Sequence, residues 1–210
     1  MIVIPGDPVG NKKVENSYEK DNNYYSKYIG LLENKVGKMK ITRLSGFYIP
    51  QLNDIVIGRV IDVLPNGWFV DINSPYLGFL ALKLLGQEEI IDPNDIFTYG
   101  DFILVQIIKV TKNKIINLAV KKKKKLNDGL IINVDPVKLP RIIGKNNSMI
   151  NLIKEGLKIE IIVGKNGRVY LNGDERNILK AIKIIKFIEE NSYKKGLTEK
   201  VKEIIEKDLF

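Results

Sequence analysis

The sequence predicts a multidomain protein that is mainly β, with an α+β domain at its C-terminal end. The chain has 210 residues, which is enough for more than one small domain, and 44% of them are hydrophobic, as in ordinary globular proteins. Short β-branched runs separated by turn residues fill its middle, whereas the C-terminal part mixes strand-like runs with amphipathic helical segments. We therefore divide the chain into residues 1–50, 51–125 and 126–210.

The first fifty residues predict a β-rich domain, because short apolar stretches alternate with polar breaks and no helical period is present. Near-alternation over Tyr25–Ile29 and Met39–Leu44 predicts two short, half-buried strands. The N-terminal stretch is interrupted at Pro5, which leaves no signal-peptide core, and no apolar run approaches the ~18–20 residues of a membrane span. We expect a soluble, cytoplasmic protein without membrane contacts.

The second region predicts five strands, which suit a small closed barrel whose second and third strands carry the ligand. The five runs are Ile55–Val63, Trp68–Ile72, Gly78–Leu85, Phe102–Val110 and Ile115–Val120, with a turn at Thr111–Lys114. Trp68 and Phe69 are neighbours on the second strand, so their side chains point to opposite faces. An outward aromatic can stack on a nucleobase, worth about 1–3 kcal/mol, while an inward one belongs to the core. The sequence leaves both assignments open.

The third region predicts the element order β-α-α-β-β-α. The runs are a strand at Leu130–Pro136, a short helical turn at Val137–Gly144, a helix at Ser148–Gly156, a hairpin at Leu157–Gly173 and a helix at Asp174–Ser192. In the last of these, apolar residues recur every three or four positions from Ile178 to Ile188, as on the buried side of a helix. A further amphipathic segment follows Thr198.

The charge balance favours a polyanionic partner, and the missing residue types exclude several chemistries. The formal net charge is +9, although only five of the 34 basic residues are Arg, so a composition bias toward Lys remains an alternative explanation. The chain has no Cys and no His, which excludes disulfides, zinc ribbons and Ser-His-Asp or Cys-His catalysis. The one tight carboxylate cluster, Asp92 to Asp95, is typical of a capped turn rather than of a metal site. We therefore predict no catalytic residue, no metal and no cofactor.

A run of five lysines, Lys121 to Lys125, follows the predicted barrel. Because such a run cannot be buried and repels itself, it is either a solvated strand end or linker, or a phosphate-contacting patch. Lys121, Lys122 and Lys123 are candidate RNA contacts in the second case.

Two near-identical loops, Ile142–Ser148 and Ile162–Arg168, differ in their surroundings. The second has the complete Gly-x-x-Gly pattern, but it lies between two strand-like runs, and Asn166-Gly167 is a strong hairpin signal in which both residues are expected to have positive φ. We therefore predict that it is a turn. The first loop precedes a helix whose N-terminus can bind an anion, and Ser148 is placed to cap that helix.

The first loop is thus the candidate RNA-binding loop. The alternative is that it has only a structural role and that Arg141 and Lys145 are merely solvated. Its closing glycine is replaced by Asn147, a residue type that tolerates left-handed φ. The candidate RNA contacts in and beside it are Arg141, Gly144, Lys145, Asn146, Asn147 and Ser148.

Four segments carry a family resemblance. Gly58–Leu80 resembles the signature of an S1 domain, which has an OB-type five-stranded barrel, and Val134–Lys154 resembles a KH segment; Val3–Asp7 and Asn53–Val63 resemble the start and the junction of the KH-and-S1 cap subunit of the archaeal RNA exosome. The match covers essentially the whole chain. The departures are Asn147 in the KH loop and Ala81, which stands where many S1 domains have a ligand-side histidine.

The resemblance implies a non-catalytic subunit that binds single-stranded RNA and feeds it to a nuclease. It implies as partners a hexameric ring of phosphorolytic ribonuclease subunits, three cap subunits per ring, and docking through residues 1–50. The alternatives are a free-standing S1/KH protein with an RNA-binding or translation-related role, and, least favoured, a metal-dependent nuclease at Asp92, Asn94 and Asp95.

Overall fold

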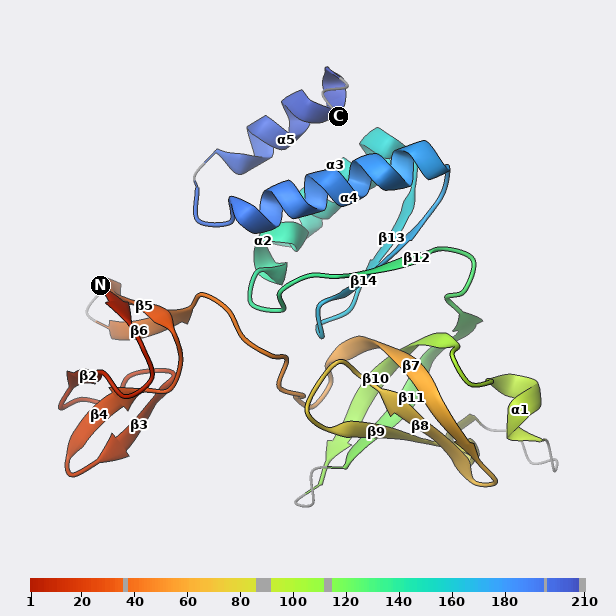
Figure 1. The fold of residues 1–210 in the computed structure, drawn as a ribbon, viewed down its shortest axis with the longest axis horizontal. Coiled ribbons are helices and arrows are strands. Elements are labelled where there is room, and N and C mark those ends of the chain that lie inside the picture. The colour runs from red at the N-terminus through yellow and green to blue at the C-terminus, as the bar shows by residue number, and fades with distance from the viewer. Residues whose placement is uncertain (36–37, 86–91, 112–114, 195, 208–210) are drawn as a thin grey trace. The chain divides into compact units, whose positions relative to one another are not determined.

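The computed structural model describes residues 1–35, 38–85, 92–111, 115–194 and 196–207 (Figure 1). The chain forms two compact units, Met1–Phe47 and Tyr48–Phe210. The predicted fold class is confirmed, since the first unit and the barrel are built from strands and the C-terminal part combines a sheet with helices.

The first unit contains two small antiparallel sheets, each with three strands. One has the order β1 (Ile2–Val3), β5 (Gly30–Lys35), β6 (Lys38–Arg43), and the other the order β2 (Pro8–Gly10), β4 (Asn23–Ser26), β3 (Ser17–Lys20). Its buried core consists of Val3, Val9, Val14 and Ile41. The predicted strand at Met39–Leu44 corresponds to β6, whereas only Tyr25 and Ser26 of the predicted strand at Tyr25–Ile29 belong to β4. Strands as short as β1 and β2 produce no periodic pattern.

The second unit begins with a closed five-stranded barrel of the order β10-β11-β9-β8-β7. Its strands are β7 (Ile55–Leu64), β8 (Gly67–Asp71), β9 (Leu77–Ala81), β10 (Phe102–Val110) and β11 (Ile116–Lys125), all paired antiparallel except β11 with β9. Trp68, Ile72 and Leu118 are among the fully buried residues inside it.

Two details of the barrel differ from the predicted strands. The third strand ends at Ala81, and Leu82–Leu85 form a 3-10 helix, η1, in which Leu85 is buried and Leu82 packs against the barrel core. The last strand continues through the lysine run to Lys125, whose backbone pairs with Ile103 of β10. Residues 112–114 of the predicted Thr111–Lys114 turn lie outside the described residues.

The C-terminal part has the predicted order β-α-α-β-β-α. Its elements are β12 (Leu130–Asn133), α2 (Leu139–Ile143), α3 (Ser148–Leu157), β13 (Glu160–Val163), β14 (Arg168–Asn172), α4 (Glu175–Glu190) and an added α5 (Leu197–Glu206). The sheet has the order β12-β14-β13, and α2, α3 and α4 cover one face of it (Figure 1).

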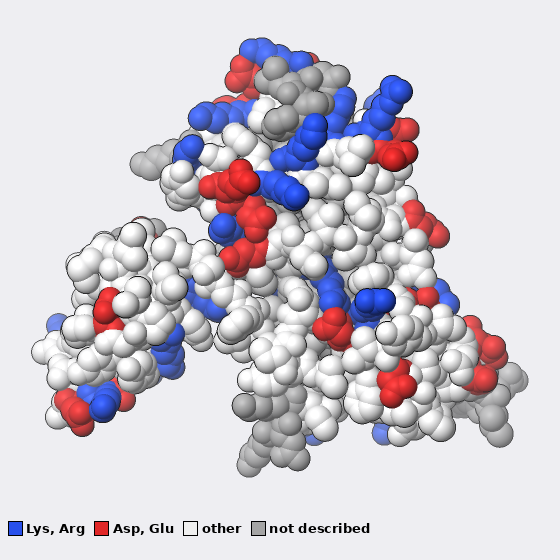
Figure 2. Space-filling model, in the orientation of Figure 1, with Lys and Arg blue, Asp and Glu red and all other residues white. Residues whose placement is uncertain are grey.

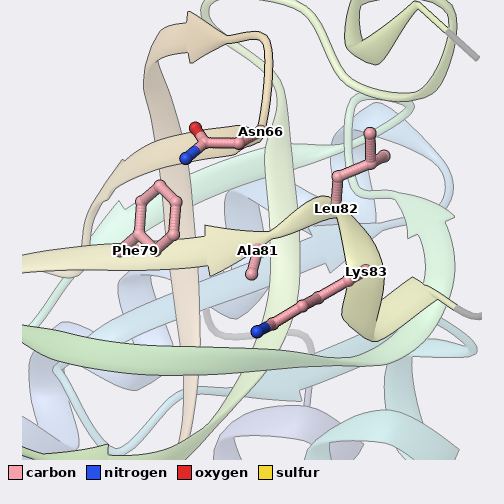
Figure 3. A pocket seen from close by; sticks show the side chains of 5 residues that line it. All are labelled: Asn66, Phe79, Ala81, Leu82 and Lys83. Atoms are coloured by element: carbon pink, nitrogen blue, oxygen red, sulfur yellow. The ribbon is translucent and has the colours of Figure 1, made fainter.

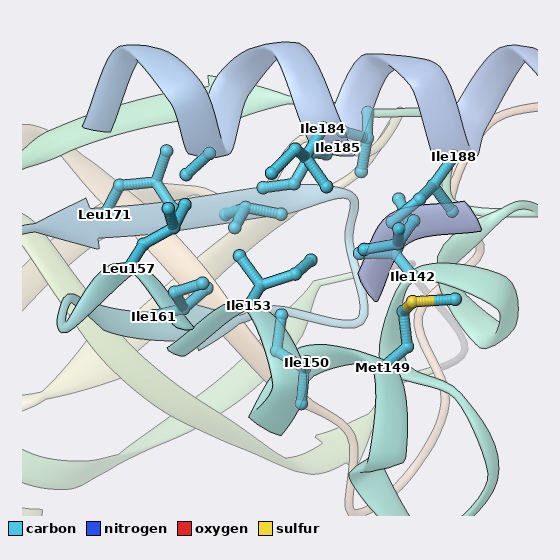
Figure 4. Close-up of a cluster of buried hydrophobic side chains, with 14 of the residues drawn as sticks. Ile142, Met149, Ile150, Ile153, Leu157, Ile161, Leu171, Ile184, Ile185 and Ile188 are labelled. Atoms are coloured by element: carbon cyan, nitrogen blue, oxygen red, sulfur yellow. The ribbon is translucent and has the colours of Figure 1, made fainter. Parts of the chain in front are cut away.

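The helices and this sheet share one apolar core, in which isoleucines from α3 and α4 face the strand side chains Ile161 and Leu171 (Figure 4). The predicted stripe of α4 is correct, with Ala181, Ile185 and Ile188 fully buried. None of the helices in the described part of the chain is long and apolar enough to cross a membrane.

Candidate nucleic-acid interface

The loop with the complete Gly-x-x-Gly pattern is a turn between β13 and β14, as predicted, and it also joins the barrel to the C-terminal sheet. The Asn166 side chain is fully buried. Its amide nitrogen donates hydrogen bonds to the carbonyl oxygens of Ile57 (2.8 Å) and Ile72 (2.9 Å), and its amide oxygen accepts from the Ile57 N–H (3.3 Å). The loop is therefore closed to RNA on the side of Asn166.

One detail of that turn was predicted wrongly. Gly167 has a left-handed φ of 83°, but Asn166 is not among the residues with positive φ. The Gly167 N–H bonds to the Gly164 carbonyl, so the four residues form a single hydrogen-bonded turn that closes on a left-handed glycine. We attribute the conformation of Asn166 to its three hydrogen bonds with the barrel.

Arg168 extends the same junction. Its guanidinium is mostly buried, donates to the carbonyl oxygens of Ile57 and Asp71, and forms an ion pair with the Asp71 carboxylate. Beneath these polar contacts Ile57, Leu104, Leu126 and Tyr170 form an apolar cluster between barrel and sheet. The barrel and the C-terminal domain are thus joined by a hydrogen-bonded and apolar interface rather than by a linker alone.

The loop between α2 and α3 faces solvent. Lys145, Asn146, Asn147 and Ser148 are exposed, and Asn146 (φ 50°) and Asn147 (φ 63°) both have left-handed backbones. The prediction that Asn147 tolerates this conformation is confirmed. Gly144 also has a positive φ of 74°, and a Cβ there would lie 2.7 Å from the Met149 nitrogen, so a glycine is required at this position.

The predicted cap at Ser148 is wrong. Ser148 already has helical backbone angles, and Asn147 occupies the N-cap position without a side-chain hydrogen bond to the helix. A serine with helical backbone angles cannot play the N-cap role, which needs a non-helical backbone such as that of Asn147. The first turn of α3 contains no acidic residue, so the positive end of the helix dipole and the exposed Lys145 present positive charge at this loop.

The structure separates Trp68 from Phe69. Trp68 is fully buried, and its indole nitrogen donates a hydrogen bond to the Phe97 carbonyl (2.8 Å), so it belongs to the barrel core and cannot contact RNA. Phe69 lies on the outer face, half-buried, with its ring 5.6 Å from the Phe79 ring in an edge-on arrangement. The outward aromatic of β8 is therefore Phe69.

A cavity of about 480 Å³ adjoins this aromatic pair (Figure 3). Phe79 and Ala81 of β9 line it together with Asn66, Leu82 and Lys83. Figure 3 shows the Asn66 amide directed toward the Phe79 ring. Since Ala81 has only a methyl group, the polar and charged groups that line this cavity come from the exposed Asn66 and Lys83 instead.

Sequence reasoning missed Phe79, Asn66 and Lys83. The signal for Phe79 was available, because it alternates with the inward Leu80 and stands opposite Phe69 in the β8–β9 pairing. Lys83 could not be predicted, because its position follows from the end of β9 at Ala81 and the start of η1.

Basic residues are distributed over several surfaces. Lys121 is an exposed residue of β11, and the side chains of Lys122 and Lys123 lie outside the described residues. Arg141 is exposed on α2, next to the candidate loop. On the face drawn in Figure 2, Lys and Arg side chains gather over the C-terminal helices with acidic side chains among them, and another basic group lies where the barrel meets the C-terminal domain.

The carboxylate of Asp92 has a structural role. The Asp92 side chain caps α1 (Pro93–Ile96) by accepting from the Asn94 N–H (2.9 Å), and this hydrogen bond lowers the pKa of the Asp92 carboxyl. The described residues contain no group of three or more Asp and Glu side chains arranged to hold a metal ion.

Comparisons with known proteins agree with this architecture. The S1 RNA binding domain family matches residues 49–121, and the KH domain family matches residues 129–177. Exosome complex component Rrp4 of Picrophilus torridus is 36% identical and Rrp4 of Methanobrevibacter smithii is 35% identical; the matches cover 99% and 96% of this chain and 93% and 69% of theirs. A crystal structure described as an exosome complex RNA-binding protein aligns with a TM-score of 0.70 and 32% identity, over 78% of this chain and 97% of that one.

Proposed function

Because the chain belongs to the family of archaeal exosome components named Rrp4, we propose that it is a non-catalytic cap subunit of an RNA exosome. It captures the 3′ ends of single-stranded RNA and passes them to a separate phosphorolytic nuclease ring for degradation and processing. Three copies on a hexameric ring are the assembly that we propose. This reading is preferred over a free-standing S1/KH protein, since the similarity to Rrp4 extends over the N-terminal unit as well.

The outward pair Phe69 and Phe79 is the observation that supports RNA binding most strongly. Two aromatic rings on the ligand-bearing strands of an OB-type barrel offer stacking surfaces to successive bases, independently of sequence. Lys83 lies beside them and is exposed, so its ammonium group is available to a phosphate of the same strand.

The α2–α3 loop is the second proposed contact. A KH domain holds the RNA backbone at such a loop, where free N–H groups meet the phosphates. Here Lys145 and Arg141 add positive charge, while the Asn147 side chain occupies the place of a glycine and hinders close approach. We therefore assign this loop a weaker grip than that of a Gly-x-x-Gly loop.

We assign docking on the ring to the first unit. Its core is small, and apolar side chains remain on its surface: Met1, Ile2, Ile4, Ile29 and Phe47 are each 48% exposed or more. Such surfaces are commonly covered by another protein. Deleting residues 1–47 should abolish co-elution with the ring subunits in gel filtration, while residues 48–210 still bind RNA. The deletion stops before Tyr48, because this residue is buried in the barrel core.

A degradation assay tests the division of labour. The chain alone, incubated with labelled RNA, phosphate and magnesium or manganese, should cleave nothing, and the ring should degrade RNA faster when the chain is present. Turnover by the isolated chain in a preparation free of contaminating nuclease would contradict the proposal. So would a ring whose activity is the same with and without the chain.

A further inference from the structure

A second groove lies where the barrel meets the C-terminal domain, and it differs in lining from the cavity beside Phe79. It has a volume of about 510 Å³, and the polar and charged residues that line it are Arg59, Asp71, Asn127, Asn133 and Arg168. Phe102 of β10 contributes an aromatic wall. No residue is shared with the lining of the first cavity.

Arg59 is the cation available to a ligand in this groove. It is exposed on the outer face of β7, and its guanidinium carbon lies 6.0 Å from the centre of the Tyr99 ring and 5.9 Å from that of Phe102. Within the described part of the chain no carboxylate forms an ion pair with Arg59, whereas Arg168 is engaged by Asp71. The two rings hold the guanidinium in place and leave its N–H groups free for an acceptor.

Tyr99 is an exposed aromatic on a fixed turn. Its side chain is 71% exposed, so packing does not account for its position. The turn is fixed by hydrogen bonds from the Thr98 N–H to the Asp101 carboxylate (2.8 Å), from the Gly100 N–H to the Val60 carbonyl (2.9 Å) and from the Val60 N–H to the Asp101 carbonyl (2.9 Å). The backbone that carries the Tyr99 ring is therefore already ordered before a ligand stacks on it.

The groove also continues the outer surface that carries Phe69. Phe69 and Asp71 are two residues apart on β8, which is ~7 Å and places both on the same face. Asp71 stands opposite Arg59 in the pairing of β7 with β8, and its negative charge is offset by Arg168. A strand of RNA that stacks on Phe69 can therefore reach Arg59 with its next nucleotides.

We propose that Arg59, Tyr99 and Phe102 form a second nucleotide site for single-stranded RNA, with a base stacked on Tyr99 and a phosphate accepting hydrogen bonds from Arg59. The inference rests on the proposed RNA-binding function and extends it to a surface outside the aromatic pair and the α2–α3 loop. The same chemistry suits a free mononucleotide, and the test separates the two.

The test measures binding of a fluorescently labelled oligouridine to the full chain by anisotropy at several salt concentrations. Arg59→Ala and Tyr99→Ala should each weaken binding about tenfold. Arg59→Ala should also reduce the slope of log affinity against log salt by about 0.7, the share of one phosphate on a single strand, and Tyr99→Ala should leave the slope unchanged. Both side chains are exposed, and matching unfolding curves should show that the fold is retained.

The matched controls are Arg176→Ala and Tyr193→Ala. Arg176 is exposed at the start of α4, and Tyr193 is 73% exposed. The two control substitutions therefore remove an arginine and a tyrosine side chain from surfaces outside the proposed site. Both should bind RNA like the wild type. If the controls lose as much affinity as the site variants, the effect is one of general charge or aromatic content, and the inference is wrong.

The remaining outcomes separate the inference from the proposed function. Unchanged RNA affinity in both site variants, with a loss in Phe69→Ala, overturns the second site and leaves RNA binding intact. A wild-type chain that binds no oligouridine at all overturns the proposed function itself. Uridine monophosphate should not compete at the concentration that saturates the oligonucleotide; if it does, and Tyr99→Ala abolishes that competition, the site takes a free nucleotide instead.

Discussion

The side chain of Asn166 forms hydrogen bonds with both backbone polar groups of Ile57, one residue in the C-terminal sheet region and the other in the barrel. The Asn166 amide supplies the hydrogen bonds that the backbone of a neighbouring strand would otherwise supply to Ile57. The loop with the complete Gly-x-x-Gly pattern, residues 164–167, therefore joins two domains. The loop in which Asn147 replaces the second glycine, residues 144–147, is the one that faces solvent.

This arrangement predicts different effects of the same change in the two loops. Asn166→Gly removes the side-chain acceptor of the buried Ile57 N–H and one donor from each of the carbonyl oxygens of Ile57 and Ile72. It should lower the free energy of unfolding of the barrel and C-terminal domain by about 3 kcal/mol, although Arg168 still donates to the Ile57 carbonyl. Asn146→Gly, at the corresponding position of the exposed loop, should change it by less than about 1 kcal/mol, because glycine adopts the left-handed backbone freely. Urea unfolding of both variants measures the difference, and equal losses would contradict the assignment.

Much of the fold followed from the sequence because its signals are local. The strands β7, β8 and β10 are continuous β-branched or aromatic runs, and the stripe on α4 has a clear helical period. The role of Asn166 could not be predicted, since its partners Ile57 and Ile72 are about a hundred residues away in the sequence. The residues of the loop itself give no signal of these contacts. The choice between Trp68 and Phe69 likewise depended on which face of β8 the barrel encloses.

Trp68 and Phe69 should respond oppositely in two assays. Trp68→Ala removes a fully buried indole and its hydrogen bond, and should destabilise the barrel by about 3–5 kcal/mol. Phe69→Ala should leave the fold intact and lower the affinity for single-stranded RNA by about 1–3 kcal/mol. Unfolding curves and anisotropy titrations measure the two effects. Wild-type RNA affinity in Phe69→Ala would remove the aromatic pair from the proposed RNA path.

The α2–α3 loop is best tested without changing Gly144, because a side chain there collides with the backbone of Met149 and would disturb the fold. Lys145→Asp reverses one exposed charge at the proposed phosphate contact and should weaken RNA binding several-fold. Asn147→Gly keeps the left-handed backbone, removes the obstructing side chain and should bind RNA as tightly as the wild type or more tightly. If neither change alters affinity, the loop is structural and RNA runs over the barrel alone.

The carboxyl group of Asp101, at the end of the barrel, should make the free energy of unfolding depend on pH. Burial by itself raises the pKa of its carboxyl, but hydrogen bonds from Lys125, the Thr98 N–H and Asn127 outweigh burial, and the pKa lies below its ordinary value of 3.8. A lowered pKa in the folded state means that the stabilisation is complete above the unfolded value and is lost as the pH falls through the folded one.

Asp101→Asn should therefore flatten the acid side of the stability profile, below about pH 5. Lys125→Met, which removes a partner of the carboxylate, should reduce stability at pH 7 and flatten the profile in the same direction. Urea unfolding between pH 3 and pH 7 gives both profiles, and a variant that keeps the wild-type slope would show that Asp101 does not cause it.

The dependence of RNA affinity on salt tests the central claim most directly, because single-stranded RNA that is held mainly through phosphates must release counterions when it binds. For the full chain and an oligouridine, log affinity should fall linearly with log salt concentration, with a slope of about −0.7 for each phosphate that is neutralised. An affinity that does not change with salt, or no binding of single-stranded RNA at low salt, would contradict the account.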